Sequence, residues 1–293
     1  YLETRESVDA YNKSLSRTLP RGLSSGADSS SNVGNYALFF THDSSFNCKL
    51  DSYNSSLTKN TVQLTEKISS NSGASIGSYA LFGGGDTISS QGGEYYGTPT
   101  GTVITFNTNL TKSSATSLSV ARENCKTGKN NQYALFAGGS TDSSGYMGNV
   151  DAYNNSLTKT TAQTISAQYS LSSLIDGAKT GGDVLFPESL YGACAHVYND
   201  SLTKSIITIA SGLYIDVTAS TKKYAVIRCF RYEETGNFEG INYQKVIKIN
   251  SSLVESIVSE NEMSDIHYAG AAFCEGNLVF AGGQEGFNNS NIA

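Results

Sequence analysis

Residues 133–139 read Tyr-Ala-Leu-Phe-Ala-Gly-Gly, and residues 150–159 read Val-Asp-Ala-Tyr-Asn-Asn-Ser-Leu-Thr-Lys. The first stretch is a short apolar run that stops at a glycine pair, which is typical of a buried strand. The second alternates apolar and polar residues, as a half-exposed strand does, and then reaches an Asn-x-x-Leu turn. Asn favours tight turns because it tolerates a left-handed backbone and its side chain bonds to neighbouring backbone groups. Together they predict two strands, followed by a hairpin into another.

Both stretches recur along the chain. The Asn of the turn returns at intervals of 42 to 53 residues, at Asn12, Asn54, Asn107, Asn154, Asn199 and Asn250. The apolar run returns upstream of the last five copies, and a final copy at 278–283 has only ten residues after it. The chain therefore begins and ends inside one repeat unit, which predicts that its two ends complete that unit and close a ring.

Each unit reads as four short strands. A small-residue strand such as 73–76 precedes the apolar run, and a Thr-rich strand such as 160–165 follows the hairpin. Helical periodicity is nowhere sustained. Four antiparallel strands repeated around an axis form a β-propeller blade, and small residues on the first strand suit a crowded axis. We predict an all-β, six-bladed propeller in one domain, 1–293. Its expected blades are 24–70, 71–122, 123–170, 171–214, 215–260 and a blade shared by 261–293 and 1–23.

The motifs resemble those of the kelch family, whose blades carry an apolar run ending in Gly-Gly and then a Val-x-x-Tyr-Asn strand. The resemblance spans essentially the whole chain. It departs from the family at Glu188-Ser189 and two other places where Gly-Gly is missing, and the chain has no tryptophan. The residues of the repeated motifs are similar to those of kelch-like proteins of Gram-positive bacteria and their phages. The resemblance implies a kelch-type propeller.

Composition narrows the classes of partner. A net charge of −6 and a pI near 5.1 remove the electrostatic attraction on which sequence-independent nucleic-acid binding depends, so we expect no nucleic-acid partner. No window approaches the about 18 apolar residues of a spanning helix, so we expect a soluble chain without membrane insertion. The start at Tyr1 indicates a domain excised from a longer protein, part of a larger polypeptide or an oligomeric assembly.

The sequence contains few patterns that are typical of catalytic or metal-binding sites. The five cysteines are widely spaced without a CxxC pair, which predicts free, mostly buried thiols. The histidines His42, His196 and His267 fall in three different predicted blades, so we expect no shared metal site and no cofactor. No serine elbow, phosphate loop or catalytic cysteine signature appears. The sequence therefore predicts no catalytic residue and no metal site.

Candidate binding residues lie in the loops that follow the apolar strand. These loops vary in length while the hairpins do not, and variable loops on a rigid scaffold commonly carry binding. Tyrosine among small polar residues offers flat contact area and adaptable hydrogen bonds. The predicted ligand-binding residues are Tyr95, Tyr96, Tyr146, Tyr191, Arg231, Tyr232, Phe238 and Phe287. The alternative is that these aromatic side chains only pack their loops down.

Two further residues, Arg122 and Tyr169, lie in connections between blades and are predicted at the channel mouth. For Arg122 the alternative is a structural side chain that donates to backbone carbonyls, which a guanidinium does well.

We expect a non-catalytic module that binds a cell-surface glycan or protein receptor through one propeller face, in a bacterial surface protein or phage tail. This places the chain outside the cell or on a virion, and it predicts no enzymatic activity. Two alternatives stay open. One is a sugar-directed enzyme such as a mutarotase or epimerase, for which loop carboxylates supply acid and base groups. The other is a structural spacer or assembly hub.

Overall fold

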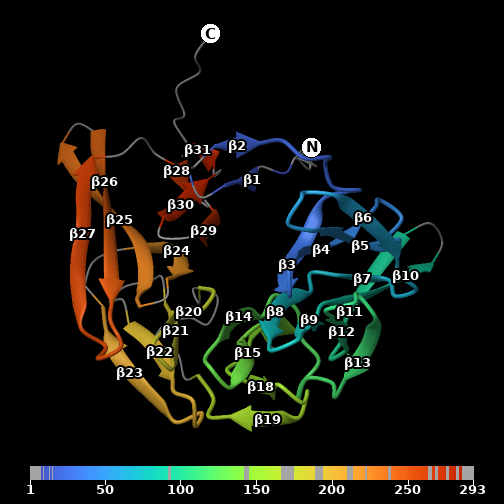
Figure 1. Ribbon diagram of the computed structural model, residues 1–293. Helices are drawn as coiled ribbons and strands as arrows, with labels where there is room; N and C mark the ends of the chain where they lie inside the picture. Colours follow the sequence, from blue (N-terminus) through green and yellow to red (C-terminus); the bar gives the residue numbers. More distant parts are fainter. Residues whose placement is uncertain are drawn as a thin grey trace. The chain divides into compact units, whose positions relative to one another are not determined.

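The computed structural model describes residues 8, 10–12, 14, 16–91, 94–141, 145–165, 175–188, 194–209, 214–221, 223–236, 239–262, 266–267, 270–274, 277–281 and 284–285. Its contacts divide the chain into two compact units, Tyr1–Ser166 and Ala167–Ala293. We describe each unit by itself (Figure 1). Every regular element in these residues is a β-strand, as predicted. None of them forms a helix long and apolar enough to cross a membrane.

Unit 1 contains three four-stranded antiparallel sheets whose strands follow chain order. The first sheet comprises β3 (Ala27–Val33), β4 (Tyr36–His42), β5 (Cys48–Tyr53) and β6 (Lys59–Gln63). The second comprises β8 (Ser72–Ile76), β9 (Tyr79–Gly83), β12 (Val103–Asn107) and β13 (Lys112–Ala115). The third comprises β14 (Lys126–Lys129), β15 (Tyr133–Ala137), β18 (Val150–Asn154) and β19 (Lys159–Ala162).

Unit 2 contains two sheets of the same kind. The fourth sheet comprises β20 (Ala178–Thr180), β21 (Asp183–Pro187), β22 (Cys194–Tyr198) and β23 (Lys204–Thr208). The fifth comprises β24 (Tyr214–Ser220), β25 (Ala225–Gly236), β26 (Glu239–Ile249) and β27 (Glu255–Glu262). In all five sheets the apolar run is the second strand and the Tyr-Asn stretch or its equivalent is the third, as the repeat predicts.

Shorter ladders complete the strand inventory. They are β1 (Ala10–Tyr11) with β2 (Arg17–Thr18), β7 (Ile68–Ser69) and β11 (Glu94–Pro99) on either side of β10 (Asp86–Gln91), β16 (Ser140–Thr141) with β17 (Gly145–Tyr146), β28 (Ile266–His267) with β31 (Gln284–Glu285), and β29 (Gly270–Cys274) with β30 (Asn277–Ala281). β1–β2 and β29–β30 belong to the segments predicted to share a sixth blade. The six-blade count, the shared blade and the single domain stay predictions.

The core of each unit lies between neighbouring sheets. Between the first and second sheets, the ring centroids of Phe40 and Phe82 lie 5.5 Å apart within one buried cluster. In unit 2, buried Leu185 and Ile227 belong to one cluster drawn from the fourth and fifth sheets. Apolar residues of the second strands therefore fill the space between successive sheets, which is why the apolar run recurs.

The first strands of neighbouring sheets approach closely. A Cβ added to Gly73 on β8 would lie 2.0 Å from the carbonyl oxygen of Ser30 on β3. Only glycine fits there, as the expectation of small residues at a crowded axis requires. In unit 2 the backbone N–H of Lys179 on β20 donates to Ser220 Oγ on β24 at 2.7 Å, so the same strand-to-strand contact recurs.

The hairpin between third and fourth strands differs from expectation in one detail. In the third sheet Asn154 Oδ1 accepts from the backbone N–H groups of Ser156 and Thr158 at 2.9 Å each, so the predicted Asn bonding is present. The left-handed residue is Leu157, with φ of 59°, rather than the Asn. The same left-handed leucine occurs at Leu57, Leu110, Leu202 and Leu253.

Two segments predicted as loops are strands. Within 86–101, residues 86–91 and 94–99 are the paired strands β10 and β11, and within 231–243, residues 231–236 and 239–243 continue β25 and β26 and pair Arg231 with Tyr243. The extra residues in these units continue backbone hydrogen bonding, which satisfies their peptide groups better than an open loop would.

Candidate functional site

Three chemically reactive side chains meet at one end of the fourth sheet. The apolar run 184–186 lies within β21, which ends at Pro187. Glu188 follows this strand, and its backbone N–H donates to the carbonyl of Cys194 at 2.9 Å. Cys194 and His196 are alternate residues of β22, so they lie on the same face of the strand. The register therefore places Glu188 beside both.

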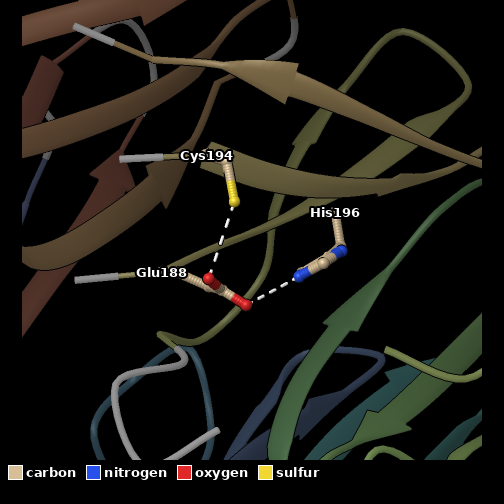
Figure 2. Close-up of side chains that lie close together, drawn as sticks. All are labelled: Glu188, Cys194 and His196. Carbon is tan, nitrogen blue, oxygen red and sulfur yellow. Dashed lines mark hydrogen bonds and ion pairs between the residues drawn. The ribbon is translucent and has the colours of Figure 1, made fainter. Parts of the chain in front are cut away.

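The carboxylate of Glu188 lies between the other two groups (Figure 2). Its Oε1 is 2.8 Å from His196 Nε2, and its Oε2 accepts a 3.6 Å hydrogen bond from the Cys194 thiol. Glu188 and His196 are each 1% exposed, whereas Cys194 is partly exposed. A buried carboxylate and a buried imidazole therefore lie beside the thiol of a partly exposed cysteine.

The protonation of the cluster follows from its contacts. A hydrogen bond between an imidazole nitrogen and a carboxyl oxygen requires a proton on one of them, so Glu188 and His196 share at least one proton. Burial and then the charge of Glu188 raise the pKa of Cys194 to about 11, which keeps the thiol neutral near pH 7. His196 Nδ1 is buried with no hydrogen-bond partner among the described residues. Such orphaned buried atoms are uncommon.

The other sheets show what these positions ordinarily hold. By strand register, Glu188 corresponds to Thr41, Gly84, Gly138 and Cys229. Cys194 corresponds to Lys49, Thr102, Asn149 and Lys245. His196 corresponds to Asp51, Ile104, Asp151 and Ile247. Among the five described sheets, only the fourth brings a carboxylate, a thiol and an imidazole together.

In the first and third sheets this third-strand position is a structural anchor. Asp151 accepts from the backbone N–H and hydroxyl of Ser119 at 2.8 and 3.0 Å. Asp51 accepts from the same two groups of Ser24. Each aspartate thus ties the segment entering its sheet to the third strand. His196 has replaced this anchor with a different chemical group.

Arg122 is the one predicted channel-mouth residue that the structure describes. Its side chain is fully buried, 3.0 Å from Asp151, and its nitrogens donate to the carbonyls of Gly138, Phe136 and Val120. These contacts are those of the structural alternative for Arg122, in which the guanidinium donates to backbone carbonyls. Tyr169, the other such residue, lies outside the described residues.

The predicted loop-face residues are only partly described. Tyr96 on β11 and Tyr146 on β17 are 48% and 57% exposed, as binding aromatics should be. For Tyr95 on β11 and for Arg231 and Tyr232 on β25, only the backbone is described. Tyr191, Phe238 and Phe287 lie outside the described residues.

The sequence reasoning missed the cluster of Glu188, Cys194 and His196. The separation of the three histidines argues against a site that they share, and it says nothing of the side chains that surround any one of them. A signal was present, because Glu188 stands where the repeat expects glycine, and Cys194 and His196 alternate on a predicted strand. The free thiols were predicted correctly for Cys48, Cys125, Cys194 and Cys229.

Comparisons with known proteins bear on the fold. Neither a protein-family model nor a curated protein matches the sequence. The solved structure of YjhT is similar with a TM-score of 0.54 at 9% identity, covering 84% of this chain and 88% of that one. Virginiamycin B lyase from Staphylococcus aureus is similar with a TM-score of 0.57 at 12% identity, covering 94% and 84%.

These comparisons overturn two expectations from the sequence. The non-catalytic recognition module and the absence of enzymatic activity are contradicted, since a similar structure that nearly spans the chain is named as a lyase. The prediction was wrong because it inferred the absence of catalysis from the absence of known catalytic motifs, although fold and sequence motif do not decide activity. Repeated four-stranded sheets and these neighbours together assign the chain a β-propeller fold.

Proposed function

We propose that this chain is an enzyme that transfers protons on a sugar, such as a mutarotase or epimerase, with Glu188 and His196 as its acid–base pair. The observation that carries the proposal is their buried 2.8 Å contact at a position that the other sheets use for structure. Acid–base catalysis needs a donor and an acceptor held within hydrogen-bond reach of the reacting atoms.

The pair suits anomer exchange. That reaction removes a proton from the anomeric hydroxyl and delivers one to the ring oxygen, so the ring opens to the aldehyde and recloses on its other face. A pair that holds one proton between two basic atoms contains both a donor and an acceptor. The partly exposed Cys194 marks the side from which a substrate hydroxyl reaches them.

The sugar class rests on the reaction that the pair suits, since opening and closing a sugar ring needs one proton donor and one proton acceptor. A similar propeller is named as a lyase, so a scaffold of comparable fold carries catalysis. These observations favour the sugar-directed enzyme over the structural spacer.

The test is anomer exchange followed by polarimetry and NMR on freshly dissolved aldohexoses and N-acetyl sugars. The chain should accelerate exchange of at least one sugar over buffer, and E188Q and H196A should each lower the rate about 100-fold or more. The matched control is H42A, which removes the histidine of the other described His–carboxylate pair, His42 with Asp28, and should keep the rate. A chain that leaves every sugar at the buffer rate refutes the proposed function.

A further inference from the structure

We propose that Glu188, Cys194 and His196 form a binding site for a zinc-class divalent metal ion. One oxygen, one sulfur and one nitrogen ligand atom lie within 4.8 Å of one another. Three protein ligands with the fourth position open is the arrangement of catalytic zinc sites, whereas structural sites close all four. The partial exposure of Cys194 leaves that fourth position on the solvent side.

The ligand set selects the kind of ion. On binding, the ion displaces the proton of the Cys194 thiol to solvent, which makes the sulfur a thiolate ligand. Thiolate and imidazole favour zinc and its transition-metal neighbours, while magnesium and calcium prefer oxygen alone. Glu188 and His196 are buried, and among the described residues their side chains pair with each other and with Cys194, so the set is shielded from competing water. The ion class is therefore zinc, with cobalt(II) as its spectroscopic substitute.

The distances need little adjustment. Zinc bonds of about 2.0 to 2.3 Å in a tetrahedron separate neighbouring ligand atoms by roughly 3.3 to 3.7 Å. The three ligand atoms, one from each residue, lie within 4.8 Å of one another, so no gap exceeds this range by more than about 1.1 Å. His196 Nε2 and Glu188 Oε1 are 2.8 Å apart because a proton joins them, and an ion in its place widens the gap by about half an ångström.

The backbone holds the ligands without help from the ion. Cys194 and His196 lie on β22, and the backbone N–H of Glu188 donates to the Cys194 carbonyl at 2.9 Å. The equivalent backbone bond in the third sheet joins Gly138 and Asn149 at 3.0 Å. The repeat therefore fixes the geometry, and only the side chains are particular to the fourth sheet.

A structural role explains the cluster less well. Asp151, at the equivalent position of His196, accepts hydrogen bonds from Ser119 and faces Arg122. His196 instead has a buried Nδ1 without a partner among the described residues. His196 therefore makes fewer stabilising hydrogen bonds among the described residues than Asp151 makes at the equivalent position.

This inference uses the residues of the proposed function and does not require it. A chain that binds the ion and leaves every sugar unchanged upholds the inference and refutes the function. A chain that exchanges anomers and binds no ion does the reverse.

The experiment is titration of the chelator-treated full chain with cobalt(II), followed by the thiolate-to-cobalt absorption band and by equilibrium dialysis. We expect one ion per chain, a band that zinc abolishes on displacing cobalt, and affinity lowered at least about 10-fold in C194S. E188Q should lower affinity and keep the band, while H42A should match the unmodified chain.

C194S replaces the sulfur with an oxygen at a partly exposed position, so the fold is expected to persist, and circular dichroism checks it. A band that survives in C194S, or the absence of any bound ion, overturns the inference.

Discussion

The guanidinium of Arg122 lies 3.0 Å from the carboxylate of Asp151, and both side chains are fully buried. Arg122 also donates to three backbone carbonyls, and Asp151 accepts from Ser119, so every charge in this group is matched. The ion pair therefore fastens the connection before β14 to the middle of the third sheet.

Breaking this pair should destabilise the protein strongly. R122M leaves the buried Asp151 with only the more distant Lys159 as a counter-charge, 3.9 Å away, and we expect a loss of about 3 kcal/mol in the free energy of unfolding from urea denaturation. The double variant R122M/D151N should lose less than the two single variants added together, since it buries no unpaired charge. Strict additivity would show that the two groups act independently.

The repeated asparagine is expected to stabilise each hairpin by itself. N154A removes two hydrogen bonds, to the backbone N–H groups of Ser156 and Thr158, and we expect a loss of about 1 to 3 kcal/mol. N154D keeps the acceptor oxygen and should recover most of it. S156A, which keeps the backbone N–H that Asn154 accepts from, is the matched control and should change unfolding by less than about 0.5 kcal/mol. Equal losses in N154A and S156A would contradict this account.

Leu157 shows why the sequence predicted the hairpin and not its geometry. Asn154 can bond its own backbone, which is a local property and could be inferred. A leucine with φ of 59° costs roughly 1 to 2 kcal/mol, and it is held there because Leu157 packs against the buried cluster around Phe136. That packing joins residues far apart in sequence, and no local pattern contains it.

Glu188 shows, for the site, what the sequence could and could not predict. Its departure from the glycine pair was visible in the sequence, and so was the alternation of Cys194 and His196. What brings them together is the register between β21 and β22, which depends on the length and path of the connection between them. Register is a tertiary property. The sequence therefore shows the three side chains and does not show that they lie together.

The other described histidine pair predicts a pH-dependent stability. His42 Nδ1 lies 2.7 Å from Asp28 Oδ2, and this hydrogen bond raises the pKa of His42 above 6.5 although burial lowers it. A histidine whose pKa is raised by folding adds stability that is fully present below about pH 6.5 and is lost as the pH rises through the folded value. D28N should therefore cost more stability at pH 5.5 than at pH 8.5.

Urea denaturation of D28N at both pH values measures this difference. The control is D28N in an H42Q background, where the residue at position 42 does not titrate and the cost should be the same at both pH values. A cost of D28N that grows with pH would assign the effect to another group.

Zinc should inhibit anomer exchange if the proposed function and the metal site are both correct. The ion takes Glu188 Oε1 and His196 Nε2 as ligands, and these are the two atoms that hold the shared proton. A coordinated lone pair cannot accept a proton, so neither of these two atoms can hold the shared proton while the ion is bound. Added zinc should lower the exchange rate in proportion to the occupied sites, and a chelator should restore it. C194S binds the ion more weakly, so inhibition should require at least about 10-fold more zinc. Faster exchange in the loaded protein would mean that the ion, and not the proton pair, performs the chemistry at this site.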